Sequence, residues 1–349
     1  MFNDEDYLVG NKETLRKRFC KDWGLPIGIY SDPYFEERIE LMDAREDWNT
    51  FTSLIHNFFH DNISEYLDAY DAAMNAIIAY IKESDAWNAM QEDPDILMKN
   101  PSICGQRELY KECNVGDVFL SIDMNKANFS ALVCYGKATG KPFHDAYDWD
   151  SFVRKIVDGK IADVIIKSKH VRQVVFGKCN SKRQVGYEKW LMNTLAEHLI
   201  DENLIKKEWL FSLNSDEIIL KANEISTSEA EEIMNAATKW STIFVPTKTE
   251  WFILGRLDGT EAYVKMPVTG YGKFQDQKKP TLKCVNPLEA PFVYRFMKNE
   301  HPKSVTDTVF LLEGKRMAKL LDIPKISMRM EKIKGLSQEK ENQEGEMDR

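Results

Sequence analysis

The chain has 349 residues, of which 43% are hydrophobic and 30% charged, and its formal net charge is −9. A chain of this length usually folds around more than one core. No apolar run approaches the roughly 20 residues that cross a bilayer, the acidic N-terminus lacks a signal-peptide pattern, and none of the cysteines form a CxxC pair. We therefore expect a cytoplasmic protein with free thiols and no membrane association.

The first region, residues 1–112, is predicted to be an acidic helical subdomain. Apolar residues recur at helical spacing through 34–99, and Asp61 and Asn62 separate two of the helices. Residues 1–100 carry 21 acidic and 9 basic side chains. A solvated helical surface is the simplest interpretation, and a surface for a protein partner is the alternative.

The second region, residues 113–240, has an α/β pattern. Its expected elements are a strand at 117–122, a short helix or turn at 126–136, a helix at 148–158, an apolar stretch at 161–166, a long helix at 168–201, a hairpin at 208–221 and a serine-capped helix at 228–240.

The third region, residues 241–330, is predicted to be a β-rich subdomain. Strands are expected at 243–245, 251–254 and 262–265, with Asp258-Gly259 as a hairpin turn, and a final helix at 304–321. Residues 331–349 are rich in Glu, Lys and Gln and are expected to be disordered.

Two acidic clusters lie within apolar strand patterns of the second region. Asp123 ends Val118-Phe119-Leu120-Ser121-Ile122, and Asp216 and Glu217 lie between Leu213 and Ile218. A carboxylate at the end of a buried strand is costly unless a partner such as a cation compensates it. If the two strands are neighbours, Asp123 and Asp216 could hold a divalent metal between them, as phosphoryl-transfer enzymes require.

Between these clusters lies a basic segment. Residues 160–189 carry eight Lys or Arg side chains against Asp163 and Glu188. A local basic stripe on an acidic protein favours contact with nucleic acid or nucleotide phosphate. The residues expected to bind phosphate are Arg172, Lys178, Lys182 and Arg183, of which Lys182 and Lys178 share a helix face.

The order of these segments resembles that of right-hand, palm-domain nucleic-acid polymerases. The segment from Asp123 to Ser130 looks like motif A and is most similar to reverse transcriptases. The segment from Leu213 to Leu220 is similar to motif C of family A DNA polymerases. His170 to Tyr187 looks like motif B, the basic fingers helix.

The resemblance implies a nucleotidyltransferase that adds nucleotides by two-metal phosphoryl transfer. It implies an α+β fold with a palm-like antiparallel sheet backed by helices, preceded by the helical subdomain and followed by the β-rich one. Catalysis would rest on Asp123, Asp216 and Glu217, with Mg²⁺ or Mn²⁺ held by Asp123, Asp216 and the Met124 carbonyl. Asn128 or Phe129 would sense the sugar of the nucleoside triphosphate, and DNA or RNA would be the partner.

Two other functions are consistent with the sequence. A non-catalytic nucleic-acid-binding or assembly protein could retain a palm-like core. A metal-dependent nuclease uses similar carboxylates, but its usual additional acids or lysine base are not evident near Asp123 and Asp216.

Overall fold

The computed structural model describes residues 4–97, 103–157, 159–179, 181–268, 275, 278–301, 305–312, 314 and 316–330. The fold is mixed α+β with an antiparallel sheet, as predicted. The residues expected to form a disordered tail lie outside the described part. No helix of the described residues combines the length and the apolar character that crossing a membrane requires.

The chain divides into two compact units, each assembled from three segments. Unit 1 consists of Met1–Trp87, Phe143–Ser181 and Val285–Ile326, and unit 2 of Asn88–Pro142, Lys182–Cys284 and Ser327–Arg349. The sequence predicts consecutive domains, whereas these units alternate along the chain.

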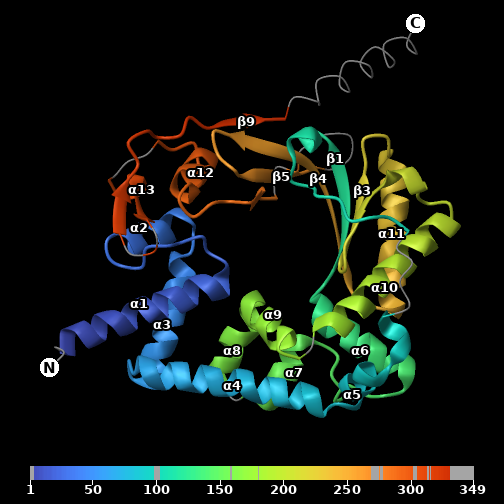
Figure 1. Ribbon diagram of the computed structural model, residues 1–349, viewed down its shortest axis with the longest axis horizontal. Coiled ribbons are helices and arrows are strands. Elements are labelled where there is room, and N and C mark those ends of the chain that lie inside the picture. Colours follow the sequence, from blue (N-terminus) through green and yellow to red (C-terminus); the bar gives the residue numbers. More distant parts are fainter. Residues whose placement is uncertain are drawn as a thin grey trace, which may run out of the picture. The chain divides into compact units, whose positions relative to one another are not determined.

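Unit 1 is mostly helical (Figure 1). Its elements are α1 (Asp4–Trp23), α2 (Tyr34–Leu41), α3 (Arg45–Phe59), α4 (Ile63–Glu83), α7 (Trp149–Ile156), α8 (Gly159–Lys167), α9 (Lys169–Gly177), α12 (Ala290–Met297), α13 (Val305–Thr308), β7 (Val309–Leu312) and β8 (Arg316–Lys319). As predicted, Asp61 and Asn62 separate two helices, α3 and α4. Asn62 caps α4, because its side chain accepts a hydrogen bond from the Glu65 backbone amide.

The core of unit 1 contains a buried polar centre. Asp22 on α1 accepts hydrogen bonds from the Tyr70 hydroxyl at 2.9 and 3.0 Å and from Ser168 Oγ at 3.0 Å. Burial raises the pKa of this carboxyl, while the two hydrogen bonds lower it. Asp22 therefore joins α1, α4 and the N-cap of α9.

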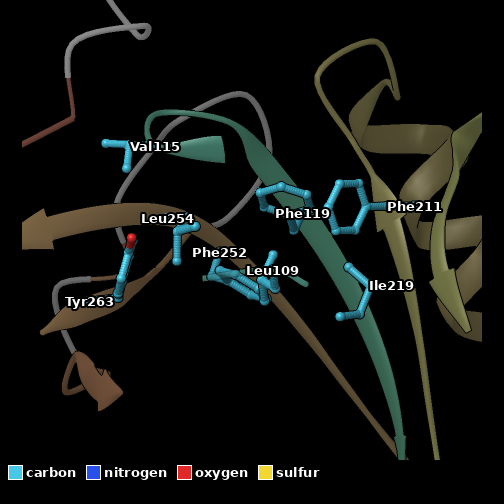
Figure 2. Close-up of a cluster of buried hydrophobic side chains, with 8 residues drawn as sticks. All are labelled: Leu109, Val115, Phe119, Phe211, Ile219, Phe252, Leu254 and Tyr263. Carbon is cyan, nitrogen blue, oxygen red and sulfur yellow. The ribbon is translucent and has the colours of Figure 1, made fainter. Parts of the chain in front are cut away.

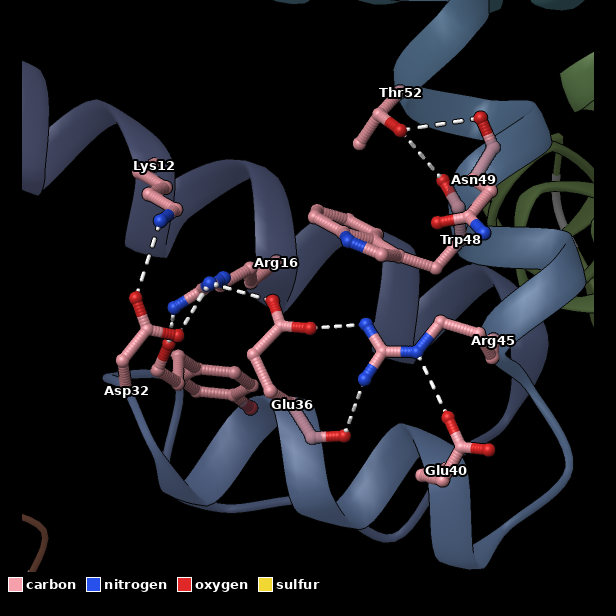
Figure 3. A network of polar contacts seen from close by, with 10 residues as sticks. Lys12, Arg16, Asp32, Glu36, Glu40, Arg45, Trp48, Asn49 and Thr52 are labelled. Carbon is pink, nitrogen blue, oxygen red and sulfur yellow. Dashed lines mark hydrogen bonds and ion pairs between the residues drawn. The ribbon is translucent and has the colours of Figure 1, made fainter.

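A second polar network fixes the first three helices of unit 1 (Figure 3). The buried Arg16 guanidinium contacts Asp32 at 2.7 Å and Glu36 at 2.9 Å, and lies over the Phe35 ring. Arg45 binds the other oxygen of Glu36. Arg16 is almost fully buried, and the carboxylates of Asp32 and Glu36 offset the cost of removing its charge from water.

Unit 2 is built on a seven-stranded antiparallel sheet with the order β2-β3-β1-β4-β5-β6, in which β9 also pairs with β4. Its elements are the 3-10 helices η1 (Pro94–Leu97), η2 (Glu112–Asn114) and η3 (Lys207–Trp209), the helices α6 (Ala127–Thr139), α10 (Ser181–Asp201) and α11 (Thr227–Ile243), and the strands β1 (Val118–Met124), β2 (Leu210–Leu213), β3 (Glu217–Lys221), β4 (Thr247–Asp258), β5 (Tyr263–Pro267), β6 (Thr281–Lys283) and β9 (Ser327–Arg329). Another helix, α5 (Asp85–Glu92), runs across the point where unit 1 gives way to unit 2.

Because β1 pairs with both β3 and β4, strands expected in two separate subdomains share one sheet. Alternation along β1 gives the sheet two faces. Leu120, Ile122 and Met124 point to one face and are buried. Phe119, Ser121 and Asp123 point to the other, which we call the carboxylate face.

An apolar cluster closes one end of the carboxylate face (Figure 2). Phe119 packs against Phe211 and Phe252, with ring centroids 5.2 and 5.8 Å apart. Leu109 and Val115, from the segment that precedes β1, complete this cluster. Burial of these side chains anchors β1 in the sheet and leaves the Asp123 end of the face polar.

Three secondary-structure predictions differ from the structure. The helix expected at 304–321 is wrong: within the described part of this range only α13 is helical, and β7 and β8 follow as a hairpin in which Gly314 has a φ of 70°. The strand expected at 243–245 is wrong, since α11 continues to Ile243 and β4 begins at Thr247. The long helix at 168–201 is interrupted after Gly177, a poor helix former, and is two helices, α9 and α10.

Candidate functional site

Asp123 and Glu217 face each other across neighbouring strands. The register of β1 and β3 pairs Asp123 directly with Glu217, so both side chains project from the carboxylate face. Asp123 is exposed, and the Glu217 side chain is 21% exposed. Like charges placed opposite each other destabilise a sheet unless a cation compensates them, so this pair needs a positive partner.

Asp216 lies at the turn that joins β2 to β3. Its carbonyl accepts a hydrogen bond of 2.8 Å from the Met124 amide, and the Asn214 amide closes the turn on the Glu217 carbonyl at 2.9 Å. The structure therefore brings the backbone of Asp123, Met124, Asp216 and Glu217 together at one end of the sheet. The two acidic strands are therefore neighbours, which is the condition that a metal shared by Asp123 and Asp216 requires.

The Glu217 carboxylate has partners on both sides along the carboxylate face. It accepts a hydrogen bond of 2.6 Å from Ser121 Oγ, and Lys265 Nζ lies 3.8 Å from the same oxygen. Lys265 Nζ is also 4.0 Å from an oxygen of Glu250 and 4.3 Å from the centre of the Phe252 ring. These contacts place one buried cation between two carboxylates.

Asn128, predicted to sense the sugar, is held from α10. Its side-chain nitrogen Nδ2 donates to Glu188 Oε1 at 2.7 Å, and the Gln184 side chain donates to its backbone carbonyl oxygen. Burial raises the pKa of Glu188 to about 7, opposed by the Asn128 hydrogen bond and reinforced by the Asp216 charge. Phe129, the other predicted sugar-sensing residue, is buried in the core.

The four predicted phosphate-binding residues belong to different units. Arg172 and Lys178 lie in unit 1, and Lys182 and Arg183 in unit 2. Arg172 is partly buried, which lowers the pKa of its guanidinium. Arg183 donates to the carbonyl of Met90, which lies within α5, and to that of Asp93, which follows it. Lys178 and Lys182 are exposed.

A cavity of about 420 Å³ adjoins Glu217 on unit 2. It is lined by Asn214, Glu217 and Ile219 from the hairpin, and by the segment from Gln106 to Tyr110. Burial and the Glu217 charge raise the pKa of Tyr110, so its hydroxyl stays protonated at neutral pH. The cavity gives small molecules access to the carboxylate beside Asp123.

Four residues of this site were not predicted from the sequence: Ser121, Glu188, Glu250 and Lys265. Lys265 follows Tyr263 and Val264 in a strand pattern. Because alternate residues of a strand share a face, its spacing from the apolar Tyr263 was the available signal that Lys265 is buried. Glu250 pairs with Ser121 across β4 and β1, a register that sequence periodicity does not give. Glu188 is one acidic residue within a basic helix, where a solvated position is the ordinary interpretation.

Within the described ranges, no group of three or more His, Cys, Asp or Glu side chains is arranged to hold a metal ion. The chemistry of Asp123, Asp216 and the Met124 carbonyl nevertheless suits Mg²⁺, which binds through one or two carboxylates and keeps several waters.

Comparison of the chain with models of protein families, with curated proteins and with solved structures finds no match.

Proposed function

We propose that unit 2 catalyses metal-dependent nucleotidyl transfer at the end of the carboxylate face. The observation that carries this proposal is the position of Asp123, which lies opposite Glu217 and beside the backbone of Asp216. The resemblance to palm-domain polymerases requires two acidic positions on adjacent antiparallel strands. One of these strands belongs to a hairpin, as β3 does here. Mg²⁺ or Mn²⁺ bound there would neutralise charge on the triphosphate and on the attacking hydroxyl.

Each residue has a role in this proposal. Asp123 and Asp216 hold the cation, and the Met124 carbonyl completes its protein ligands. Glu217 adds a second negative charge beside Asp123 and retains its hydrogen bond from Ser121. Asn128 lies in the first turn of α6 and is held by Glu188; in this proposal it contacts the sugar of a nucleoside triphosphate. Lys182 is the exposed cation of α10 that contacts nucleic-acid or nucleotide phosphate.

A second function is favoured by the pairing of Lys265 with Glu217 and Glu250. A face that carries its own counter-ion does not need a metal to remain folded. A non-catalytic nucleic-acid-binding or assembly protein with this sheet is therefore the alternative.

The test is incorporation of labelled nucleotides into a DNA or RNA strand with Mg²⁺ or Mn²⁺. Asp123→Asn and Asp216→Asn should each reduce incorporation by at least about a hundredfold, since metal clamping supplies several kcal/mol to the transition state. Asp201→Asn, at the exposed end of α10 in the same unit, should retain the parent rate. Parent rates in both site variants, or no incorporation by the parent under any condition, would favour the non-catalytic alternative.

A further inference from the structure

Lys265 is a buried cation held by two ion pairs. Its side chain is 7% exposed, and its two ion pairs, at 3.8 Å to Glu217 and 4.0 Å to Glu250, exceed hydrogen-bonding distance. Among the residues that the structure describes, its ammonium makes no hydrogen bond, and it lies 4.3 Å from the centre of the Phe252 ring. An ammonium has three donors, so this one is held by charge rather than by directed bonds.

The two carboxylates come from strands on opposite sides of β1. Glu217 is on β3 and Glu250 is on β4, and both point to the carboxylate face because Ser121 pairs with Glu250 and Asp123 with Glu217. Lys265 reaches them from β5, over Phe252. A buried charge persists only when it is paired, so removing the cation would leave two partly buried anions without compensation.

We propose that Lys265 is the resident cation of the carboxylate face, and that its ammonium fills a position between Glu217 and Glu250 for which a divalent cation competes. The inference rests on the proposed function in one respect, that a divalent cation enters this face.

The geometry gives this competition a direction. Ser121 Oγ donates at 2.6 Å to the same Glu217 oxygen that faces Lys265. This hydrogen bond keeps the oxygen in place whether or not the ammonium is there. Without the Lys265 charge, the carboxylates of Glu217 and Glu250 have lost the cation between them. Carboxylate oxygens are the ligands that hard divalent cations prefer. Loss of the lysine charge should therefore increase affinity for such an ion, where loss of a purely packing residue would not.

The experiment compares the full-length parent with Lys265→Met, which keeps the length of the side chain and removes its charge. In chelator the variant should melt at a lower temperature than the parent, and Mn²⁺ should restore most of that loss while shifting the parent less. Calorimetric titration should show Mn²⁺ binding at least about tenfold more tightly to the variant, since a unit charge about 4 Å away is a large electrostatic effect. No nucleotide is used, so the result is independent of whether the protein transfers nucleotides.

Lys239→Met is the matched control. Lys239 is exposed on α11 in the same unit, so its removal should change Mn²⁺ affinity by less than about threefold. The double variant Lys265→Met with Glu250→Gln removes one charge of each sign and should return affinity and melting temperature toward the parent.

Equal or weaker Mn²⁺ binding to a folded Lys265→Met variant would overturn the proposal. If that variant unfolds in chelator, folding on addition of Mn²⁺ supports the proposal. If it stays unfolded in Mn²⁺, the proposal is refuted, whatever the double variant does, because recovery there reports only the charge balance between Lys265 and Glu250.

Discussion

The side-chain nitrogen Nδ2 of Asn128 donates to Glu188 Oε1 at 2.7 Å, and this bond joins the first turn of α6 to α10. Glu188 is 2% exposed. Burial raises its pKa from 4.5 to about 7, and the charge of Asp216 adds to the increase. The ionisation of Glu188 should therefore affect both the stability of unit 2 and the surroundings of the acidic hairpin.

The first prediction concerns the pH dependence of stability. Between pH 4.5 and about 7 the folded state binds the Glu188 proton and the unfolded state releases it, so the free energy of unfolding should fall as pH rises through this window. Glu188→Gln should abolish that slope. Above pH 7 the variant should be the more stable protein by on the order of 3 kcal/mol, measured by urea unfolding across pH.

Glu197→Gln is the control for this prediction, because Glu197 is exposed on the same helix. It should leave the slope intact. A slope that persists unchanged in Glu188→Gln would show that Glu188 is ionised in the folded protein at pH 5.

The second prediction separates two adjacent basic residues. Arg183 binds the carbonyls of Met90 and Asp93, so Arg183→Ala should lower the free energy of unfolding by about 1–3 kcal/mol. Lys182 is exposed, and Lys182→Ala should leave stability unchanged within about 0.5 kcal/mol. If α10 contacts nucleic acid, Lys182→Ala should also reduce the salt dependence of binding by about 0.7–0.9 in log–log slope. Unaltered salt dependence would make this helix surface a solvated one.

The third prediction uses two tyrosines on α4. Tyr70 donates to the buried Asp22, so Tyr70→Phe should lower the free energy of unfolding at pH 7 by about 1–3 kcal/mol. Among the described residues the buried Tyr66 hydroxyl has no hydrogen-bond partner, so Tyr66→Phe should be neutral or stabilising. Because the hydrogen bond favours the ionised form of Asp22, the cost of Tyr70→Phe should shrink as acid protonates that carboxyl. Equal costs for the two variants would argue against this explanation.

The fourth prediction tests a helix cap. Ser226 and Glu229 form a capping box at the start of α11, with Ser226 Oγ accepting from the Glu229 amide at 3.2 Å. Ser226→Ala should cost about 1 kcal/mol of stability, whereas Ser228→Ala should cost clearly less. A thermal unfolding comparison of the two variants decides which serine begins the helix.

Local patterns in the sequence predicted the elements whose signals are themselves local. Apolar spacing located α4, and Asp61 and Asn62 were predicted to separate it from the preceding helix. Asp258-Gly259 predicted the turn between β4 and β5, and Gly259 has a φ of 87° there. The apolar runs beside Asp123 and Asp216 indicated two strands, whereas the pairing of these strands is a feature of the sheet register.

Features that depend on strand register could not be predicted in this way. Nothing in the segment around Glu250 indicates that it pairs with Ser121, and the burial of Lys265 follows from β5 lying next to β4. The helix expected at 304–321 fails at the hairpin of β7 and β8, whose pairing is likewise a matter of strand register. Gly314 was the local signal against a helix, since its φ of 70° is a turn conformation.

The alternation of the two units along the chain determines how this protein can be dissected. The chain passes between the units at five points, so no single cut separates them. A fragment beginning at residue 113 would lack the start of unit 2 and retain isolated pieces of unit 1. Fragment expression is therefore unsuited to assigning function to either unit, and substitutions in the intact chain, or insertions at the segment junctions, are the appropriate approach.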